Sequence, residues 1–500
     1  MAKISQYYGI AESLDNLRLI PSSLITEEIE GLYGQRILSE MNKIIRYYEI
    51  YEKGVEVRYS NVDGDSETPK LKLKFIRELI NKEARFMMGK TPEFKVKNKE
   101  LIKQENKVEV NDATVMQNVL DTILNDNKIG DQLLKAAKDC LIGKRVACVL
   151  NFNETNGVTI SFVPSLEFVY EQEDTSGDLT KFICFYQLQD TDDKYNQRLY
   201  KKKYWLEDGS CFVSEEIYDG YGSVVETIIS PQKLNIDFIP AQIVLNDGLL
   251  GDLDGESEVK ILMEDEQYLT YLNAKDMKAV DKNMNPVRYA IDASPGSTKD
   301  LSIAPGAFWD LATSEDSDTK QANVGILESS MSYSDALNNT FKRIKSQMFG
   351  QVDVPEFNLE TMLGSITSGK GMRAVYWGLI TRTDEKMLSW KPFLSNIAKM
   401  VLKGIKAYPI SLKKHGYEGI TLPDSNFDVV VENLYPIPED EESEKQVDIM
   451  EVNAQTMSKK AYMMKWRGLT EEEALKELQQ IAIERELIED SYSFDNTNNV

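Results

Sequence analysis

The chain has 500 residues, a formal net charge of −24, one histidine and four cysteines. At about 150 residues per domain, this length predicts about three domains. A hydrophobic fraction of 42% with 9% aromatic residues supplies sizeable cores and excludes wholesale disorder. The sequence has no run of about 18 apolar residues, so we expect no transmembrane helix, and its start lacks the basic and apolar regions of a signal peptide.

The cysteines and the histidine argue against metal and redox chemistry. Cys140, Cys148, Cys184 and Cys211 show no Cys-x-x-Cys spacing and lie in apolar or strand-like contexts, so we expect free, buried thiols in a reducing compartment. His415 lies in a polar loop that contains glycine, and we expect it at the solvated surface. A histidine-rich metal site or a histidine-dependent catalytic triad is therefore not expected.

The charge is distributed unevenly along the chain. Residues 68–107 carry twelve basic against five acidic side chains, which form either a solvated or salt-bridged surface or a contact for phosphate groups. Residues 439–490 carry fifteen acidic against seven basic side chains. The overall negative charge repels nucleic acid at long range and argues against a protein that coats DNA.

The N-terminal third is expected to be helical. Apolar side chains recur at steps of three and four residues from Thr26 to about Lys53, which predicts an amphipathic helix. A second helix is expected from Leu73 to a stop at Gly89 and Pro92. Residues 112–142 show the same helical spacing.

The spacing then changes to the two-residue alternation of strands. Turns at Asn156–Gly157 and Asp208–Gly209 each separate two alternating segments, which predicts two β-hairpins. Residues 143–245 are therefore expected to form an antiparallel sheet region, in one α+β domain with the preceding helices.

A helical hairpin is expected next. Long helices are predicted at Ser257 to about Lys282 and at Ser332–Phe349, and they bracket a compact insert at 286–328 with short apolar segments. Two such helices around an insert suggest an antiparallel pair with a small module at its tip.

The C-terminal part is expected to be mostly helical. A long helix is predicted at about 370–402, with a kink at Pro392, and a strand follows at 427–431. A capping box at Thr470–Glu473 predicts the start of a helix in the acidic tail. The last ten residues are expected to be frayed.

One segment approaches a nucleotide-binding motif. Gly364–Gly371 matches a Walker A loop except at its last position, where Gly371 lacks the hydroxyl that would ligate magnesium. The preceding residues also do not form a buried apolar strand. A flexible loop that enters a helix is the simpler interpretation.

Two acidic turns could hold a cation, but neither matches a calcium loop. Asn61, Asp63 and Asp65, and likewise Asp252 and Asp254, lack the glycine at loop position six and the glutamate at position twelve of an EF-hand. We interpret them as solvated turns, with a weak ion site between subunits as the alternative. No carboxylate pair stands out for acid–base catalysis.

The succession of short motifs resembles the portal proteins of long-tailed, siphovirus-like double-stranded DNA bacteriophages. Asn81–Pro92 resembles the family's helix with a following Gly-x-x-Pro, and Cys140–Cys148 with Phe162–Pro164 resembles its glycine-containing turn into the first sheet. Ile239–Leu262 is similar to the strand that enters the first stem helix, and Gly364–Lys370 before a kinked helix is similar to the tunnel loop.

The resemblance implies an α+β, mainly helical subunit with an α/β wing, a two-helix stem, a small α/β clip, a kinked long helix and a helical crown. The implied parts are an N-terminal arm (1–25), a wing of helices plus antiparallel sheet (26–255), a first stem helix (256–283), a clip (284–331), a second stem helix (332–350), a tunnel loop (351–369), a long kinked helix with the closing wing strand (370–438), an acidic helical crown (439–490) and a disordered tail (491–500).

The function that the resemblance implies is structural. A ring of copies, usually twelve, would stand at the unique capsid vertex as the conduit for DNA packaging and ejection. Its implied partners are further copies of itself, double-stranded DNA passing through without sequence specificity, the terminase large subunit, head-completion or adaptor proteins, and major capsid and scaffolding proteins. No enzymatic activity, cofactor, metal or membrane is implied. The location would be the virion, after assembly in the host cytoplasm.

The resemblance also implies candidate site residues. The tunnel loop and the start of the next helix would line the DNA channel with Asp353, Glu356, Glu360, Ser365, Thr367, Ser368 and Lys370. An acidic loop without bases suits a channel that lets DNA slide. The stem would place Lys342, Arg343 and Lys345 either on the DNA backbone or in inter-subunit ion pairs with Glu264, Asp265 and Glu266.

Two other classes of function stay open at this point. A nucleotide-binding enzyme would use Lys370 of the Walker-A-like loop to bind phosphate. An acidic scaffold or adaptor protein would need no ring.

Overall fold

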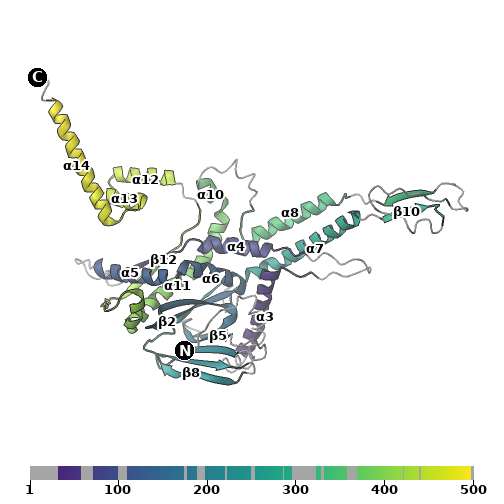
Figure 1. The fold of residues 1–500 in the computed structure, drawn as a ribbon, viewed down its shortest axis with the longest axis horizontal. Helices are drawn as coiled ribbons and strands as arrows, with labels where there is room; N and C mark the ends of the chain where they lie inside the picture. Colours follow the sequence, from purple (N-terminus) through teal and green to yellow (C-terminus); the bar gives the residue numbers. More distant parts are fainter. Residues whose placement is uncertain are drawn as a thin grey trace. The chain divides into compact units, whose positions relative to one another are not determined.

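Figure 1 shows the computed structural model of the chain. It describes residues 32–57, 71–98, 110–173, 177–188, 198–219, 222–248, 254–284, 287–294, 313, 322–327, 331–356, 369–420, 422–437 and 441–496. The chain divides into a larger unit, residues 1–356 and 378–435, and a smaller unit, residues 357–377 and 436–500.

Four helices begin the described part of the larger unit: α3 (Leu32–Lys53), α4 (Phe75–Met88), α5 (Val110–Asp126) and α6 (Ile129–Gly143). The apolar spacing correctly predicts the helices over 32–53 and 75–88. In α4 most apolar side chains are buried, and Ile76, Leu79, Ile80 and Met87 are fully so. The helix ends at Gly89, whose backbone N–H donates to the carbonyl oxygen of Arg85.

A three-stranded antiparallel sheet follows, in the order β3-β2-β9. Its strands are β2 (Arg145–Asn153), β3 (Gly157–Pro164) and β9 (Ala241–Leu245). The hairpin expected at Asn156–Gly157 is confirmed, with Gly157 at a φ of +74°. The central strand β2 is buried over its first six residues, as a strand covered on both faces must be.

A second antiparallel sheet has five strands, which lie side by side in the same order as in the sequence. Its strands are β4 (Phe168–Gln172), β5 (Leu179–Leu188), β6 (Arg198–Glu207), β7 (Ser210–Tyr218) and β8 (Val224–Lys233). Asp208 and Gly209, at φ values of +49° and +70°, form the expected tight turn between β6 and β7. Side chains of both sheets form one core cluster, which includes Val149, Phe168, Phe182, Tyr204 and Ala241.

The region 112–142 is helical, as expected, and it consists of two helices, α5 and α6. Lys128 has a φ of +50°, a left-handed conformation that ends α5. The side-chain amide of Asn127 donates to the carbonyl oxygen of Ile123, at 2.8 Å, and its carbonyl accepts from the backbone N–H of Ile160 on β3, at 2.9 Å. The contact of Asn127 with β3 thus determines where α5 ends. The spacing of apolar residues cannot predict such a contact.

The four cysteines are free and buried, as expected, whereas the expectation of a solvated histidine is wrong. His415, in the short helix η3 (Pro409–His415), has a side chain only 3% exposed. Its Nε2 accepts from the backbone N–H of Val158, at 3.0 Å, so the ring proton lies on Nδ1 and faces Asp126 Oδ2, at 2.6 Å. Both ring nitrogens are satisfied inside the fold, which explains the burial.

A two-stranded sheet joins distant parts of the larger unit. Strand β1 (Glu93–Asn98) pairs antiparallel with β12 (Phe427–Glu432), with Phe94 opposite Val431. The sequence predicts β12 but not β1, although Phe94 and Val96 alternate with lysines as in an edge strand.

The expected helical hairpin is present. Helix α7 (Glu258–Met284) contacts α8 (Ser334–Gln351). The hydroxyl of Tyr333, just before α8, donates to Asp276 in the second half of α7, and Gln351 at the end of α8 bonds to Asp265 in the first half. The two helices are therefore antiparallel (Figure 1). Between them, β10 (Val287–Ile291) and β11 (Asn323–Leu327) form an antiparallel pair.

The long C-terminal helix is divided at Tyr376, and the kink expected at Pro392 stays a prediction. Helix α10 (Gly369–Val375), which belongs to the smaller unit, ends at a turn at Tyr376, and α11 (Trp377–Ala407) then runs through Pro392 without an interruption of its helical assignment. The proline therefore does not divide the helix, and the change of unit at residue 377 coincides with the break.

The described end of the smaller unit is helical, as expected. It contains α12 (Glu441–Asn453), α13 (Lys459–Arg467) and α14 (Glu471–Asn496). The capping box is confirmed, because the backbone N–H of Thr470 donates to the Glu473 carboxylate and the backbone N–H of Glu473 donates to Thr470 Oγ1. Helix α14 reaches Asn496, so the expected fraying at residue 491 begins too early. In the described part of the chain, no helix combines the length and apolarity needed to cross a bilayer.

Substitution at Gly404 tests the packing of α11 on β2. A Cβ at Gly404 would overlap the ring of Phe152, which stacks on Tyr408 at 6.0 Å between ring centroids. Alanine usually stabilises a helix relative to glycine by about 1 kcal/mol, but overpacking costs about 1 to 3 kcal/mol. We expect Gly404→Ala to lower the apparent Tm measured by differential scanning fluorimetry.

The matched control for this substitution is Gly350→Ala. Gly350 lies near the end of α8, where an added Cβ meets nothing within 4 Å, so its Tm should not fall. Adding Phe152→Leu to Gly404→Ala should recover part of the loss. An unchanged Tm for Gly404→Ala alone would show that the ring does not hold this position.

Candidate functional site

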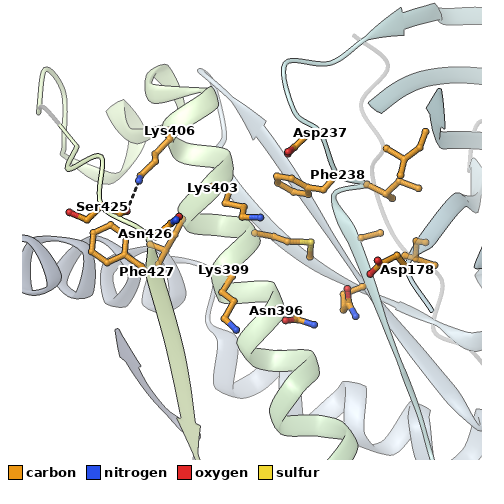
Figure 2. Close-up of a pocket in the computed structure, with 17 residues that line it drawn as sticks. Asp178, Asp237, Phe238, Asn396, Lys399, Lys403, Lys406, Ser425, Asn426 and Phe427 are labelled. Atoms are coloured by element: carbon orange, nitrogen blue, oxygen red, sulfur yellow. Dashed lines mark hydrogen bonds between the residues drawn. The ribbon is translucent and has the colours of Figure 1, made fainter. Parts of the chain in front are cut away.

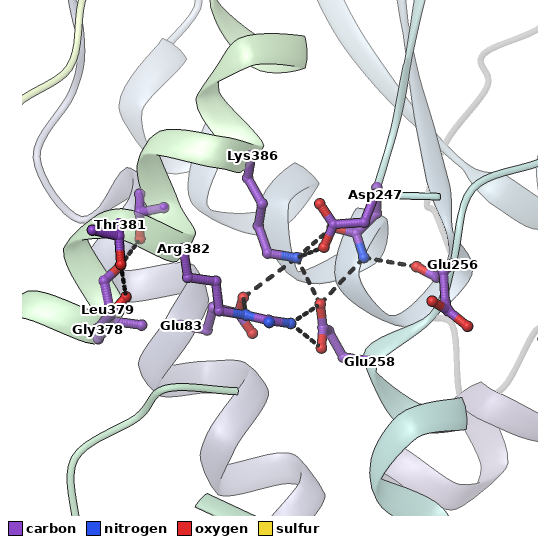
Figure 3. Close-up of polar contacts among 11 residues, drawn as sticks. Glu83, Asp247, Glu256, Glu258, Gly378, Leu379, Thr381, Arg382 and Lys386 are labelled. Carbon is purple, nitrogen blue, oxygen red and sulfur yellow. Dashed lines mark hydrogen bonds and ion pairs between the residues drawn. The ribbon is translucent and has the colours of Figure 1, made fainter. Parts of the chain in front are cut away.

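Charged side chains from three helices meet inside the larger unit (Figure 3). They are Glu83 of α4, Glu258, the first residue of α7, and Arg382 and Lys386 of α11. The guanidinium of Arg382 donates from Nη2 to both carboxylate oxygens of Glu258, each at 2.8 Å, and from Nε to Glu83 Oε1, at 3.1 Å. We refer to these four residues as the junction.

The ammonium group of Lys386 completes the junction. Its Nζ donates to Glu258 Oε1 at 2.6 Å, and to Asp247 Oδ2 and Asn246 Oδ1, in the turn after β9, at 2.7 and 2.9 Å. It also lies 3.4 Å from Glu83 Oε1. These contacts fully engage the three donors of an ammonium group.

Burial makes the pairing obligatory. The side chains of Glu258, Glu83 and Lys386 are 0%, 1% and 1% exposed, and that of Arg382 is 15% exposed. A buried charge without a partner is strongly destabilising, although a complete buried pair adds little net stability. The junction therefore specifies the arrangement of the three helices.

The two glutamates of the junction have different pKa values. Burial and the neighbouring charge of Glu258 raise the pKa of Glu83 from its ordinary value of 4.5 to about 7. Burial acts in the same direction on Glu258, but the charges of Lys386 and Arg382 outweigh it and lower its pKa. Near neutral pH, Glu258 is thus the charged carboxylate of the junction, and Glu83 carries its proton part of the time.

A third buried carboxylate lies two turns further along α7. Glu266 is fully buried, and its Oε2 accepts from the backbone N–H of Ile76, at 2.6 Å, in the first turn of α4. Burial raises the pKa of Glu266 to about 7, against the opposing effect of the backbone N–H groups of Ile76, Val55 and Phe75. Glu266 is therefore a capping group for α4 within the same chain, and we do not retain it as an inter-subunit partner.

The other candidate residues of the stem differ in exposure. Glu264, Lys342 and Arg343 are exposed on α7 and α8, and Asp265 is half-buried. Lys345 is engaged within the chain, because its Nζ lies 2.8 Å from Glu356 Oε1 and 5.4 Å from the ring centroid of Phe75.

The expected tunnel loop is described only at its two ends. Asp353 has a φ of +52°, and its side chain lies beside Gly378 at the start of α11. The Lys345 pairing lowers the pKa of Glu356, and Ser346 Oγ also donates to this carboxylate at 2.9 Å. Lys370 lies in α10. Glu360, Ser365, Thr367 and Ser368 lie outside the described residues, as does most of the Walker-A-like segment.

The two acidic turns lie almost entirely outside the described residues, so their interpretation as solvated turns stays a prediction. Asn61, Asp63, Asp65 and Asp252 lie outside the described residues, and Asp254 is paired with Arg145 Nη1 at 3.3 Å. No group of three or more histidine, cysteine, aspartate or glutamate side chains suited to a metal occurs in the described part.

Sequence reasoning missed the junction, although one signal was present. The apolar stripe of α11 includes Leu379, Trp390 and Phe393, and Lys386 falls on the same side of the helix. A lysine on a buried stripe indicates a buried partner. The identity of that partner, Glu258, 128 residues away, comes only from the tertiary structure.

The sequence matches the model of a protein family described as "Phage portal protein, SPP1 Gp6-like" over residues 33–490. No curated protein sequence matches the chain.

Among solved structures, the chain is similar to a chain of "Virion of native gene transfer agent (GTA) particle", with 9% identity, a TM-score of 0.39 and coverage of 79% of this chain and 89% of that chain. It is also similar to a chain of "Neck of native GTA particle computed with C12 symmetry", with 9% identity, a TM-score of 0.36 and coverage of 78% and 90%. A chain of "Neck of empty GTA particle computed with C6 symmetry" shows 9% identity, a TM-score of 0.38 and coverage of 86% and 94%.

Removal of one cation tests the junction. Lys386→Met leaves Glu83, Glu258 and Asp247 with Arg382 alone, so we expect a loss of about 3 to 5 kcal/mol of stability, measured by urea unfolding. Lys260→Met removes an exposed pair with Glu256 and should change stability by less than about 1 kcal/mol. Adding Glu83→Gln to Lys386→Met should recover part of the lost stability. If Lys386→Met does not lower stability and Glu83→Gln recovers none, the charges of the junction do not balance one another.

The raised pKa of Glu83 predicts a pH dependence. Between pH 4.5 and about 7 the folded chain binds more protons at Glu83 than the unfolded chain, so stability falls as the pH rises through this range. Glutamine imitates the protonated side chain. We expect Glu83→Gln to reduce the slope of stability against pH in urea unfolding between pH 5 and 8, whereas an identical slope would show that Glu83 is charged throughout.

Proposed function

We propose that copies of this chain, which belongs to the SPP1 Gp6-like family of phage portal proteins, form a ring at one vertex of a capsid. DNA would pass through the centre of this ring. The family match over residues 33–490 is the observation that carries the proposal. As a portal protein, the chain is a structural component of a phage-like particle. Membership of a structural family suggests that the chain is not an enzyme. We therefore do not propose nucleotide binding for the Walker-A-like residues 364–371.

The exposed side of the helix pair supports lateral packing of copies. On α7 the side chains of Met277, Val280 and Met284 share one side of the helix and are 37%, 37% and 77% exposed. Apolar side chains gathered on one exposed helix are typical of surfaces that a partner covers. We propose that α7 and α8 are the stem helices and that residues 284–331 between them form the clip.

The proposed channel combines the stem with the loop that follows it. Residues 351–369 would be the tunnel loop, at which Asp353, Glu360, Ser365, Thr367 and Ser368 face DNA and Lys370 begins the next helix. The ion pair between Glu356 and Lys345 reduces the negative charge that this loop presents. The remaining carboxylates would repel phosphate groups and allow a duplex of any sequence to slide.

Partners and location follow from the same proposal. The ring, of about twelve copies as the resemblance implies, would bind the terminase large subunit during packaging and head-completion or adaptor proteins afterwards. It would contact major capsid and scaffolding proteins at the capsid vertex of the virion, after assembly in the host cytoplasm. Residues 26–255 would form the wing and residues 439–490 the crown.

Negative-stain electron microscopy of the purified protein tests the ring. The expected images show closed rings with a central hole of duplex width, which is about 20 Å. Particles that stay monomeric at all concentrations would contradict the proposal and favour an acidic scaffold protein.

Charge reversal separates two roles for Lys342 and Arg343, both exposed on α8. If they pair with Glu264 of a neighbouring copy, Lys342→Glu with Arg343→Glu should reduce ring formation in native mass spectrometry, and Glu264→Lys should restore it. If they contact DNA, rings should form normally while packaging of DNA into procapsids slows. The matched control is Lys445→Glu with Lys476→Glu on the smaller unit. Normal rings and normal packaging would exclude both roles.

A further inference from the structure

A cavity of about 540 Å³ opens on the larger unit, away from α7, α8 and the junction (Figure 2). Helix α11 forms one side of it, the segment 237–242 forms another, and residues 425–427 before β12 close a third. Its volume lies in the range of pockets that bind small ligands or single side chains of a partner.

The cavity has an apolar interior and a charged rim. Its apolar lining includes the side chains of Leu179, Leu206, Phe238, Ile239, Met400 and Phe427. Lys399, Lys403 and Lys406 line it from one face of α11, as the steps of four and three residues require. Figure 2 shows these lysines along the helix, with Asp178 and Asp237 across the cavity.

Two of the three lysines have no acidic partner in the described part of the chain. Lys399 forms an ion pair with Asp428 at 2.7 Å. Lys406 donates to the backbone carbonyl oxygen of Ser425 at 2.9 Å and lies over an aromatic ring. Lys403 is exposed and lies 5.9 Å from the ring centroid of Phe238. Uncompensated cations beside an open apolar cavity are notable in a chain of net charge −24.

We propose that this cavity binds an acidic segment of another polypeptide. An apolar side chain of the segment would enter the cavity, and two flanking carboxylates would bind Lys403 and Lys406. Contact with the apolar walls supplies the affinity, and the lysines select for negative charge. The inference is independent of ring formation and gives the larger unit a site for a protein partner.

The same observations argue against DNA as the occupant. Asp178 and Asp237 on the rim would repel the closely spaced phosphates of a duplex, which carries one charge for about every 1.7 Å of its axis. A phosphate backbone also has no apolar group that could cover the aromatic and aliphatic walls of the cavity. A peptide can place an apolar group in the cavity and position its carboxylates away from the two aspartates.

Fluorescence anisotropy with the full-length protein tests the proposal. The probe is a fluorescein-labelled peptide in which one phenylalanine is flanked by glutamates on both sides. We expect saturable binding that weakens with salt, at least about tenfold weaker binding when the glutamates are replaced by glutamines, and weaker binding when glycine replaces the phenylalanine. An unlabelled 20-base-pair duplex should not compete.

Three variants locate the site. Lys403→Gln with Lys406→Gln should weaken binding about tenfold, and Met400→Trp should weaken it as much by narrowing the cavity while both lysines stay. Lys413→Gln with Lys414→Gln, two exposed lysines on η3, is the matched control and should bind normally. Unfolding curves confirm that each variant is folded. Equal binding by all variants, competition by the duplex, or no binding up to millimolar peptide would overturn the proposal.

Discussion

The larger unit depends on two buried carboxylates in the first half of α7. Glu258 is bound by Arg382 and Lys386 of α11, and Glu266 accepts a backbone N–H at the start of α4. Both carboxylates are fully buried, and a charge in that position is tolerated only when its partners are in place. A shift of these helices would separate the buried charges from their partners or remove the cap from the start of α4. Glu83 adds a second carboxylate to the same junction, and burial together with the charge of Glu258 raises its pKa.

This constraint connects the elements to which we assign the portal function. Helix α7 is the proposed first stem helix, and α11 begins eight residues after the proposed tunnel loop ends, with Arg382 in its second turn. The bidentate contact between Arg382 and Glu258 thus links the base of the stem to the start of the long helix. A relative shift of these two helices would break bonds to buried charges, so they behave as one rigid piece. The Lys345–Glu356 pair fastens the beginning of the loop to α8 by a weaker, half-exposed contact.

The net charge of the chain is better understood from where the individual charged side chains lie in the structure. A net charge of −24 argues against a protein that holds DNA, and the proposed channel agrees with that, because it lets DNA pass without binding it. The basic side chains act on their immediate surroundings. Some neutralise buried carboxylates, as Lys386 does, and others, such as Lys403 at the cavity on α11, face solvent beside apolar walls. Lys403 and Lys406 are the lysines at which we propose that an acidic partner binds.

The sequence by itself determined which segments are helices and strands, because apolar spacing, turn residues such as Asp208–Gly209 and the Thr470–Glu473 capping box are local. It also indicated the family through the order of its elements. Only the tertiary structure decided the break at Asn127, the burial of His415, the pairing of β1 with β12 and the junction around Glu258. Each of these depends on a partner far away in the chain, and a polar side chain carries no local signal of the partner that will satisfy it. Local patterns fix the elements, whereas buried polar contacts fix how the elements meet.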